Sequence, residues 1–191
     1  MKMRMVFLTV VLMLAAPAMP LFGEDKAPFD TAQAMPPMGP PPEMKQMEFL
    51  VGDWDIKGKM RMQPTDTNWM EFTSTASNKL VVGGAALQTD YSGPMMGQDF
   101  VGLALRTYDR ETKQWQQLWV DNFGARIGLY TGGKEGDAWV FSGEDKYGGM
   151  TMQGRTVEYD IKPDSYKWKM ETSLDGGKTW FTGMEATYTK K

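Results

Sequence analysis

Methionine is the residue whose number and spacing could carry chemistry in this chain. The sequence contains 18 methionines in 191 residues. Pairs recur at Met35/Met38, Met44/Met47, Met60/Met62, Met95/Met96 and Met150/Met152. Thioethers are soft ligands that select Cu(I), but methionine also fills irregular apolar cavities. Because Met60/Met62 and Met150/Met152 have strand spacing, each pair shares a face. The pattern favours an apolar cavity lining, with a periplasmic Cu(I)-handling protein as the alternative.

Histidine and cysteine are both absent from the sequence. This excludes Ser-His-Asp and Cys-His catalysis, zinc or haem held by either residue, and an acylated-cysteine anchor. Carboxylates are plentiful, but no spacing selects a general acid–base pair. An enzyme that uses Asp, Glu, Tyr or Lys is therefore a lesser alternative. The leading prediction has no catalytic residue, no metal and no cofactor.

The net charge of the chain limits the kinds of partner that the protein can bind. The formal net charge is −3 and the sequence contains no run of Lys and Arg. Nucleic-acid binding requires a basic face, so nucleic acid is excluded as a partner. The oligomeric state is left open by these features.

Strands must position any such site. Between Gly52 and Met62, Trp54, Ile56 and Met60 alternate with charged residues, which predicts a half-buried strand. Further runs predict strands at residues 69–76, 85–91, 100–108, 115–120, 125–130, 138–141, 157–161, 166–170 and 180–188, with a loop at 92–97. We expect an all-β fold, an antiparallel up-and-down barrel of about ten strands, with a short helix over residues 43–51 plugging one end.

The N-terminus differs in composition from the rest. Residues 1–23 begin with Lys2 and Arg4 and continue as an apolar run of about a dozen residues, which predicts a signal peptide. Cleavage after Ala18 and cleavage after Gly23 both fit, and an uncleaved anchor is the alternative. Residues 24–43 form a Pro-rich linker, and residues 44–191 form the domain. The predicted location is periplasmic or secreted, with no integral membrane span after signal removal.

Several segments resemble one family. They are Phe49–Trp54, Val82–Gly84, Tyr91–Gly102, Tyr108–Asp109 and Tyr188–Lys191. Together they resemble an uncharacterised bacterial family of lipocalin-like (calycin-type) proteins, the domain of unknown function 1579, over residues 44–191. The resemblance implies a barrel able to enclose an apolar cavity and brings no assigned reaction. Where the family ends in Tyr-x-Arg, this chain has Tyr188, Thr189 and Lys190.

The leading functional prediction is an exported, non-catalytic protein that binds a small, largely apolar ligand. Trp54 is expected to close the barrel floor beneath Lys190, and Arg106 to orient an anionic end of the ligand. Alternatives for Arg106 are the outer face or an internal acid, and a structural envelope protein with a filled barrel is an alternative function. The predicted lining is Trp54, Ile56, Met60, Phe72, Phe100, Arg106, Trp119, Tyr159, Trp168 and Met170.

One turn has a specific pattern. Residues 173–180 match the Asp-box, Ser-x-Asp-x-Gly-x-Thr-Trp, and resemble the repeated hairpins of sialidase-type propellers. Asp175 can accept backbone N–H groups in such a turn. A propeller would need the element repeated, and no repeat is present. The single copy therefore predicts a stabilised hairpin and not an active site.

Overall fold

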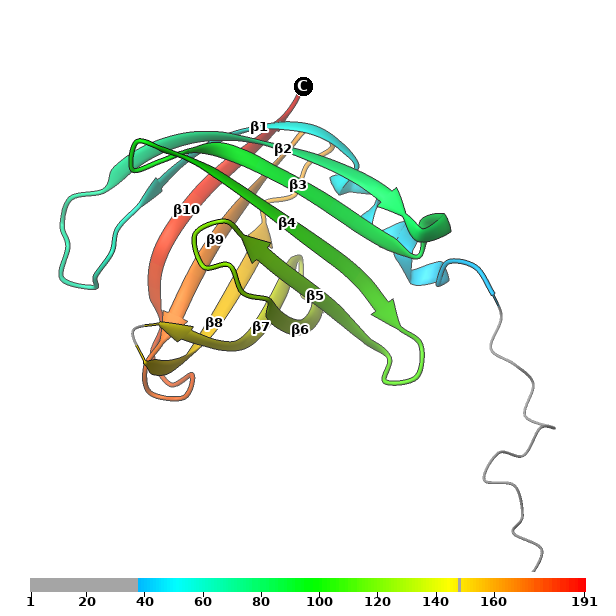
Figure 1. Cartoon of the computed structure of the whole chain (residues 1–191). Helices are drawn as coiled ribbons and strands as arrows, with labels where there is room; N and C mark the ends of the chain where they lie inside the picture. Colours follow the sequence, from blue (N-terminus) through cyan, green and yellow to red (C-terminus); the bar gives the residue numbers. More distant parts are fainter. Residues whose placement is uncertain (1–37, 148) are drawn as a thin grey trace, which may run out of the picture. The chain divides into compact units, whose positions relative to one another are not determined.

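Ten strands close into one antiparallel barrel within the described part of the chain (Figure 1). The computed structural model describes residues 38–147 and 149–191. Each strand pairs with its neighbours along the chain, and the first strand pairs with the last. The predicted up-and-down barrel is therefore confirmed, and its closure removes sheet edges.

The strands are joined by turns and loops and are preceded by a short helix. A 3-10 helix, η1, covers Pro42–Leu50, and a second, η2, covers Val82–Gly84. The strands are β1 Gly52–Met60, β2 Met70–Val81, β3 Ala86–Met95, β4 Gln98–Asp109, β5 Gln114–Asp121, β6 Gly128–Glu135, β7 Ala138–Tyr147, β8 Met150–Tyr159, β9 Ser165–Ser173 and β10 Phe181–Lys190. We call the end that carries η1 the helix end. The opposite end, formed by the hairpins β1–β2, β3–β4, β5–β6, β7–β8 and β9–β10, is the hairpin end.

Several boundaries differ from the sequence prediction, and three of them bear on the barrel wall. Strand β3 continues through Gly93 and Pro94 to Met95, in the stretch predicted as a loop. Strand β6 covers Gly128–Glu135, later than the predicted 125–130, and contains Gly132. A Cβ at Gly132 would collide with the carbonyl oxygen of Val140, so this glycine allows a close approach of two strands. Strand β8 begins at Met150, ahead of the predicted start.

The helix end is sealed by η1. Met44, Met47 and Leu50 of η1 are buried, as the predicted plug requires. The backbone oxygen of Leu50 accepts hydrogen bonds from the indole nitrogen of Trp54 and the amide of Asn78, both at 2.8 Å. These contacts fix the helix against β1 and β2.

Aromatic side chains fill the interior beneath η1. The rings of Trp54 and Tyr166 meet edge to face at 5.0 Å, and those of Trp115 and Trp139 at 5.2 Å. The ammonium of Lys190 lies 5.6 Å from the Trp54 ring. The predicted floor, a buried Trp54 with Lys190 over it, is present.

The Asp-box hairpin between β9 and β10 has the predicted bonding. A carboxylate oxygen of Asp175 accepts the backbone N–H groups of Lys178 and Thr179 at 3.0 and 2.9 Å. The other oxygen accepts the Thr179 hydroxyl at 2.7 Å. These hydrogen bonds lower the pKa of Asp175 to about 2. Trp180 packs against the guanidinium of Arg155 at 4.0 Å.

The predicted signal peptide, residues 1–23, and residues 24–37 of the predicted linker lie outside the described residues. Among the described residues, every helix is too short or too polar to cross a membrane.

Candidate functional site

The interior of the barrel has two unlike halves. Trp54 and Ile56 are fully buried at the helix end and fix the inner face of β1. Cross-strand partners share a face, so the partners of these two residues also point inward. Repeating this step from strand to strand identifies the inward-facing residues of the whole barrel. Toward the hairpin end the inward side chains are only half-buried. They form what we call the hairpin-end wall: Met60, Phe72, Tyr91, Phe100, Trp119, Met170 and Met184.

An aromatic cluster forms one side of this wall. The Phe100 ring stacks with Trp119 at 6.4 Å and meets Tyr91 edge to face at 5.7 Å. A Cβ at Gly102 would collide with the Trp119 indole, so the ring lies directly over this glycine. The sequence places a glycine here because only a residue without a side chain leaves room for the ring.

Few polar groups reach the cluster. The hydroxyl of Tyr91 donates to Ser74 at 2.7 Å, and burial raises the pKa of this phenol. The Trp119 indole donates to a carboxylate oxygen of Asp121 at 2.7 Å. An apolar wall with a few oriented polar groups is typical of small-molecule sites.

Arg106 lies deeper, toward the helix end. Its guanidinium donates to both oxygens of Glu158, at 2.7 and 2.9 Å, and also to Gln117. It lies 4.2 Å from the Phe141 ring, beneath the Met47 sulfur of η1. This internal ion pair is the alternative that the sequence left open for Arg106, and it neutralises the cation without a ligand.

Apart from Tyr159, the other predicted lining residues divide into two groups. Trp54 and Ile56 belong to the sealed floor, and Trp168 lies half-buried next to it, paired with Ala186. Met60, Phe72, Phe100, Trp119 and Met170 lie in the hairpin-end wall.

Tyr159 is a correction, because it lies on the outer face. Glu158 points inward to meet Arg106, so its neighbour Tyr159 must point outward. The sequence predicts Tyr159 inside, because large apolar residues are expected to face the interior. Tyr91 and Met184 were missed, although Met184 alternates with Ala186 and Tyr188 on the last strand.

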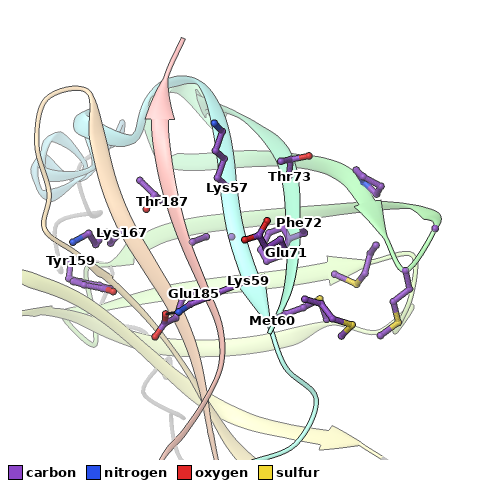
Figure 2. A pocket seen from close by; sticks show the side chains of 17 residues that line it. Lys57, Lys59, Met60, Glu71, Phe72, Thr73, Tyr159, Lys167, Glu185 and Thr187 are labelled. Atoms are coloured by element: carbon purple, nitrogen blue, oxygen red, sulfur yellow. Dashed lines mark ion pairs between the residues drawn. The ribbon is translucent and has the colours of Figure 1, made fainter. Parts of the chain in front are cut away.

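An opening in the wall lies beside this site. Strands β2 and β3 are paired from Thr75–Ser92 to Val81–Ala86, and no further toward the hairpin end. The pocket in Figure 2 is lined there by Met70 and Phe72 from β2 and by Met95 and Met96 from the end of β3 and the turn after it. It continues over charged side chains on the outer face, including Lys59 and Glu185, which form an ion pair at 3.1 Å.

Exposed apolar side chains surround the hairpin end. Phe123 in the β5–β6 loop is 74% exposed, and Leu174 in the β9–β10 loop is 70% exposed. All five hairpins contribute to this apolar rim, which consists of Met62, Met96, Phe123, Ile127, Met150 and Leu174. Exposed apolar residues gathered around one opening indicate an interaction site more often than scattered ones do.

The acidic side chains of the described residues are dispersed. Within residues 38–147 and 149–191, no three acidic side chains come together as a hard-metal site requires.

Comparison with known proteins settles the family. The family model described as "Protein of unknown function (DUF1579)" matches residues 39–190. This chain is a DUF1579 protein. The resemblance seen in the sequence is therefore confirmed. A search of curated proteins gave no match to this DUF1579 chain.

The fold has a counterpart among solved structures. The crystal structure of Rv2717c from M. tuberculosis is similar to this DUF1579 protein with a TM-score of 0.53. The two sequences are 12% identical, and the similarity covers 80% of this chain and 99% of Rv2717c. At this identity the likeness shows a shared fold only.

Proposed function

We propose that this DUF1579 protein binds a small, largely apolar molecule in the hairpin-end half of its barrel, without catalysing a reaction. The observation that carries the proposal is the contrast between the two halves of the interior. Floor residues such as Trp54 and Phe141 are fully buried, whereas Phe72, Phe100 and Trp119 are only half-buried. Half-buried aromatic rings facing inward leave apolar surface that a ligand can cover.

The polar groups at the site favour an apolar ligand with a small polar end. Because Arg106 is neutralised by Glu158, its charge is not available to an anionic head group of the ligand. The Ser74–Tyr91 hydroxyl pair is the nearest uncharged polar group of the wall. The apolar rim and the opening between β2 and β3 supply apolar entrances.

Titration with the uncharged fluorescent probe Nile red tests the proposal. We compare Phe100→Gln with its matched control Val101→Gln, because these neighbours point to opposite faces of β4. An amide buried without a partner costs about 1–3 kcal/mol, so Phe100→Gln should weaken binding about tenfold. Val101→Gln should leave binding unchanged. Absence of probe binding to the unaltered protein, or equal effects of both variants, would contradict the proposal.

Export is part of the same proposal and rests on residues 1–23. N-terminal sequencing of the protein from its source should find a mature chain that starts after Ala18 or after Gly23. An intact Met1 on a soluble protein would contradict export. Native mass spectrometry of the same sample should show a bound small molecule.

A further inference from the structure

Four methionines occupy consecutive register positions across four neighbouring strands. Met70 of β2 pairs with Met60 of β1, and Met60 pairs with Met184 of β10. Met184 in turn pairs with Met170 of β9. We call Met70, Met60, Met184 and Met170 the methionine row. The members lie up to 124 residues apart in sequence (60 to 184), so the row exists only because the barrel closes.

The four side chains share one face within reach of one another. Cross-strand partners have Cβ atoms about 4.5–5.5 Å apart. Met60 alternates with the fully buried Ile56, and Met184 with the buried Ala186, so the row faces the interior. Because methionine has three rotatable side-chain bonds, thioethers at adjacent positions can converge on one ion.

Packing of a core does not account for the row. Met44 and Met47 of η1 are core methionines, with exposures of 3% and 0%. By contrast Met70 is 44% exposed, and Met60, Met170 and Met184 are half-buried. Met60 and Met70 also line the pocket of Figure 2, so an ion can reach the row from outside.

We propose that the methionine row binds one soft monovalent cation, Cu(I), through three of its four thioethers. Soft thioether ligands select Cu(I) over hard cations. The chain has no cysteine or histidine to compete for the ion. The inference is independent of the apolar-ligand proposal, although the two sites share Met60, Met170 and Met184.

Anaerobic competition between the full-length protein and a chromophoric Cu(I) chelator tests this site. The variant Met60→Leu/Met184→Leu removes the two central thioethers, and leucine conserves volume and apolar character. The control Met150→Leu/Met152→Leu removes the same number of thioethers on β8, outside both the row and the pocket of Figure 2. We expect the row variant to lose at least about tenfold in Cu(I) affinity and the control to retain it.

A second measurement separates this inference from the proposed function. X-ray absorption of the Cu(I)-loaded protein should show a sulfur-only shell. The row variant should keep its circular dichroism spectrum, because leucine conserves the volume and apolar character of methionine. Lack of Cu(I) competition by the unaltered protein, or equal losses in both variants, overturns the metal site. Nile red binding that persists in either case leaves the apolar site standing.

Discussion

Arg106 and Glu158 form a bidentate ion pair that crosses the interior of the barrel, with N···O distances of 2.7 and 2.9 Å. Arg106 belongs to β4 and Glu158 to β8, and three strands separate these two around the wall. Both side chains are more than nine-tenths buried. The pair therefore joins opposite walls of the barrel just beneath η1.

Breaking this pair should destabilise the barrel strongly. Glu158→Gln leaves the Arg106 cation buried without a counter-charge, which costs about 3–5 kcal/mol in unfolding free energy. Equilibrium unfolding in urea measures the loss. The exposed pair Lys59–Glu185 provides the control, and Glu185→Gln should cost less than about 1 kcal/mol. Similar losses in the two variants would show that the buried charge is not the cause.

The close approach of Gly102 and Trp119 makes a second prediction. In Gly102→Ala the new methyl group collides with the indole, and overpacking of this kind costs about 1–3 kcal/mol. The displaced ring should also change its fluorescence maximum and weaken Nile red binding. Gly154→Ala is the control, because the nearest atoms to its Cβ are 3.7 Å away. A stable Gly102→Ala protein with unchanged fluorescence would show that the Trp119 ring does not lie against Gly102.

Acid should weaken the Asp-box hairpin over a defined range. The pKa of Asp175 is lowered from 3.8 to about 2 in the folded protein. A lowered carboxyl pKa stabilises the fold above about pH 4, and this contribution is lost as the pH falls toward 2. The Tm of Asp175→Asn should therefore lie below that of the unaltered protein at pH 6 and approach it near pH 2. A constant difference in Tm between the two proteins from pH 6 to pH 2 would contradict this contribution of Asp175.

The phenol of Tyr130 should ionise only at high pH. Burial and the negative charge of Asp145 raise the pKa of this phenol to about 12. A raised phenol pKa contributes stability below pH 10, and this contribution is lost as the pH rises through 12. Asp145→Asn should lower the Tyr130 pKa toward 10, as followed by NMR of ring-labelled tyrosine. An unchanged titration would contradict the contribution of Asp145.

Much of the fold could be predicted from the sequence, because the alternation of inward and outward side chains along a strand is a local property. The run Trp54, Ile56 and Met60 already identified β1 and its inner face. The inner face of β8 could not be predicted from the sequence. The carboxylate of Glu158 points inward there because it pairs with Arg106, 52 residues away. The alternation of Val157 and Tyr159 therefore indicated the wrong face. Polarity predicts the face of a strand only where no buried charge needs a partner.

The candidate site was predicted in part for the same reason. Phe72, Phe100 and Trp119 were found because large apolar residues alternate on their strands. The methionine row was not found, because the sequence shows neighbours such as Met60/Met62 and the structure pairs Met60 with Met184. Cross-strand register depends on turn lengths and bulges, such as the one between Thr182 and Met184.

The pairing of β1 with β10 has a consequence for how the chain folds. These two strands are joined in register from Trp54–Lys190 to Met60–Met184. The contacts that close the barrel form only after almost the whole domain has been synthesised. Loop closure over such a separation is slow, and until it is complete β1 and β9 both present free edges to other chains. Strand β10, Phe181–Lys190, therefore completes the fold, because the barrel cannot close until this strand pairs with both β9 and β1.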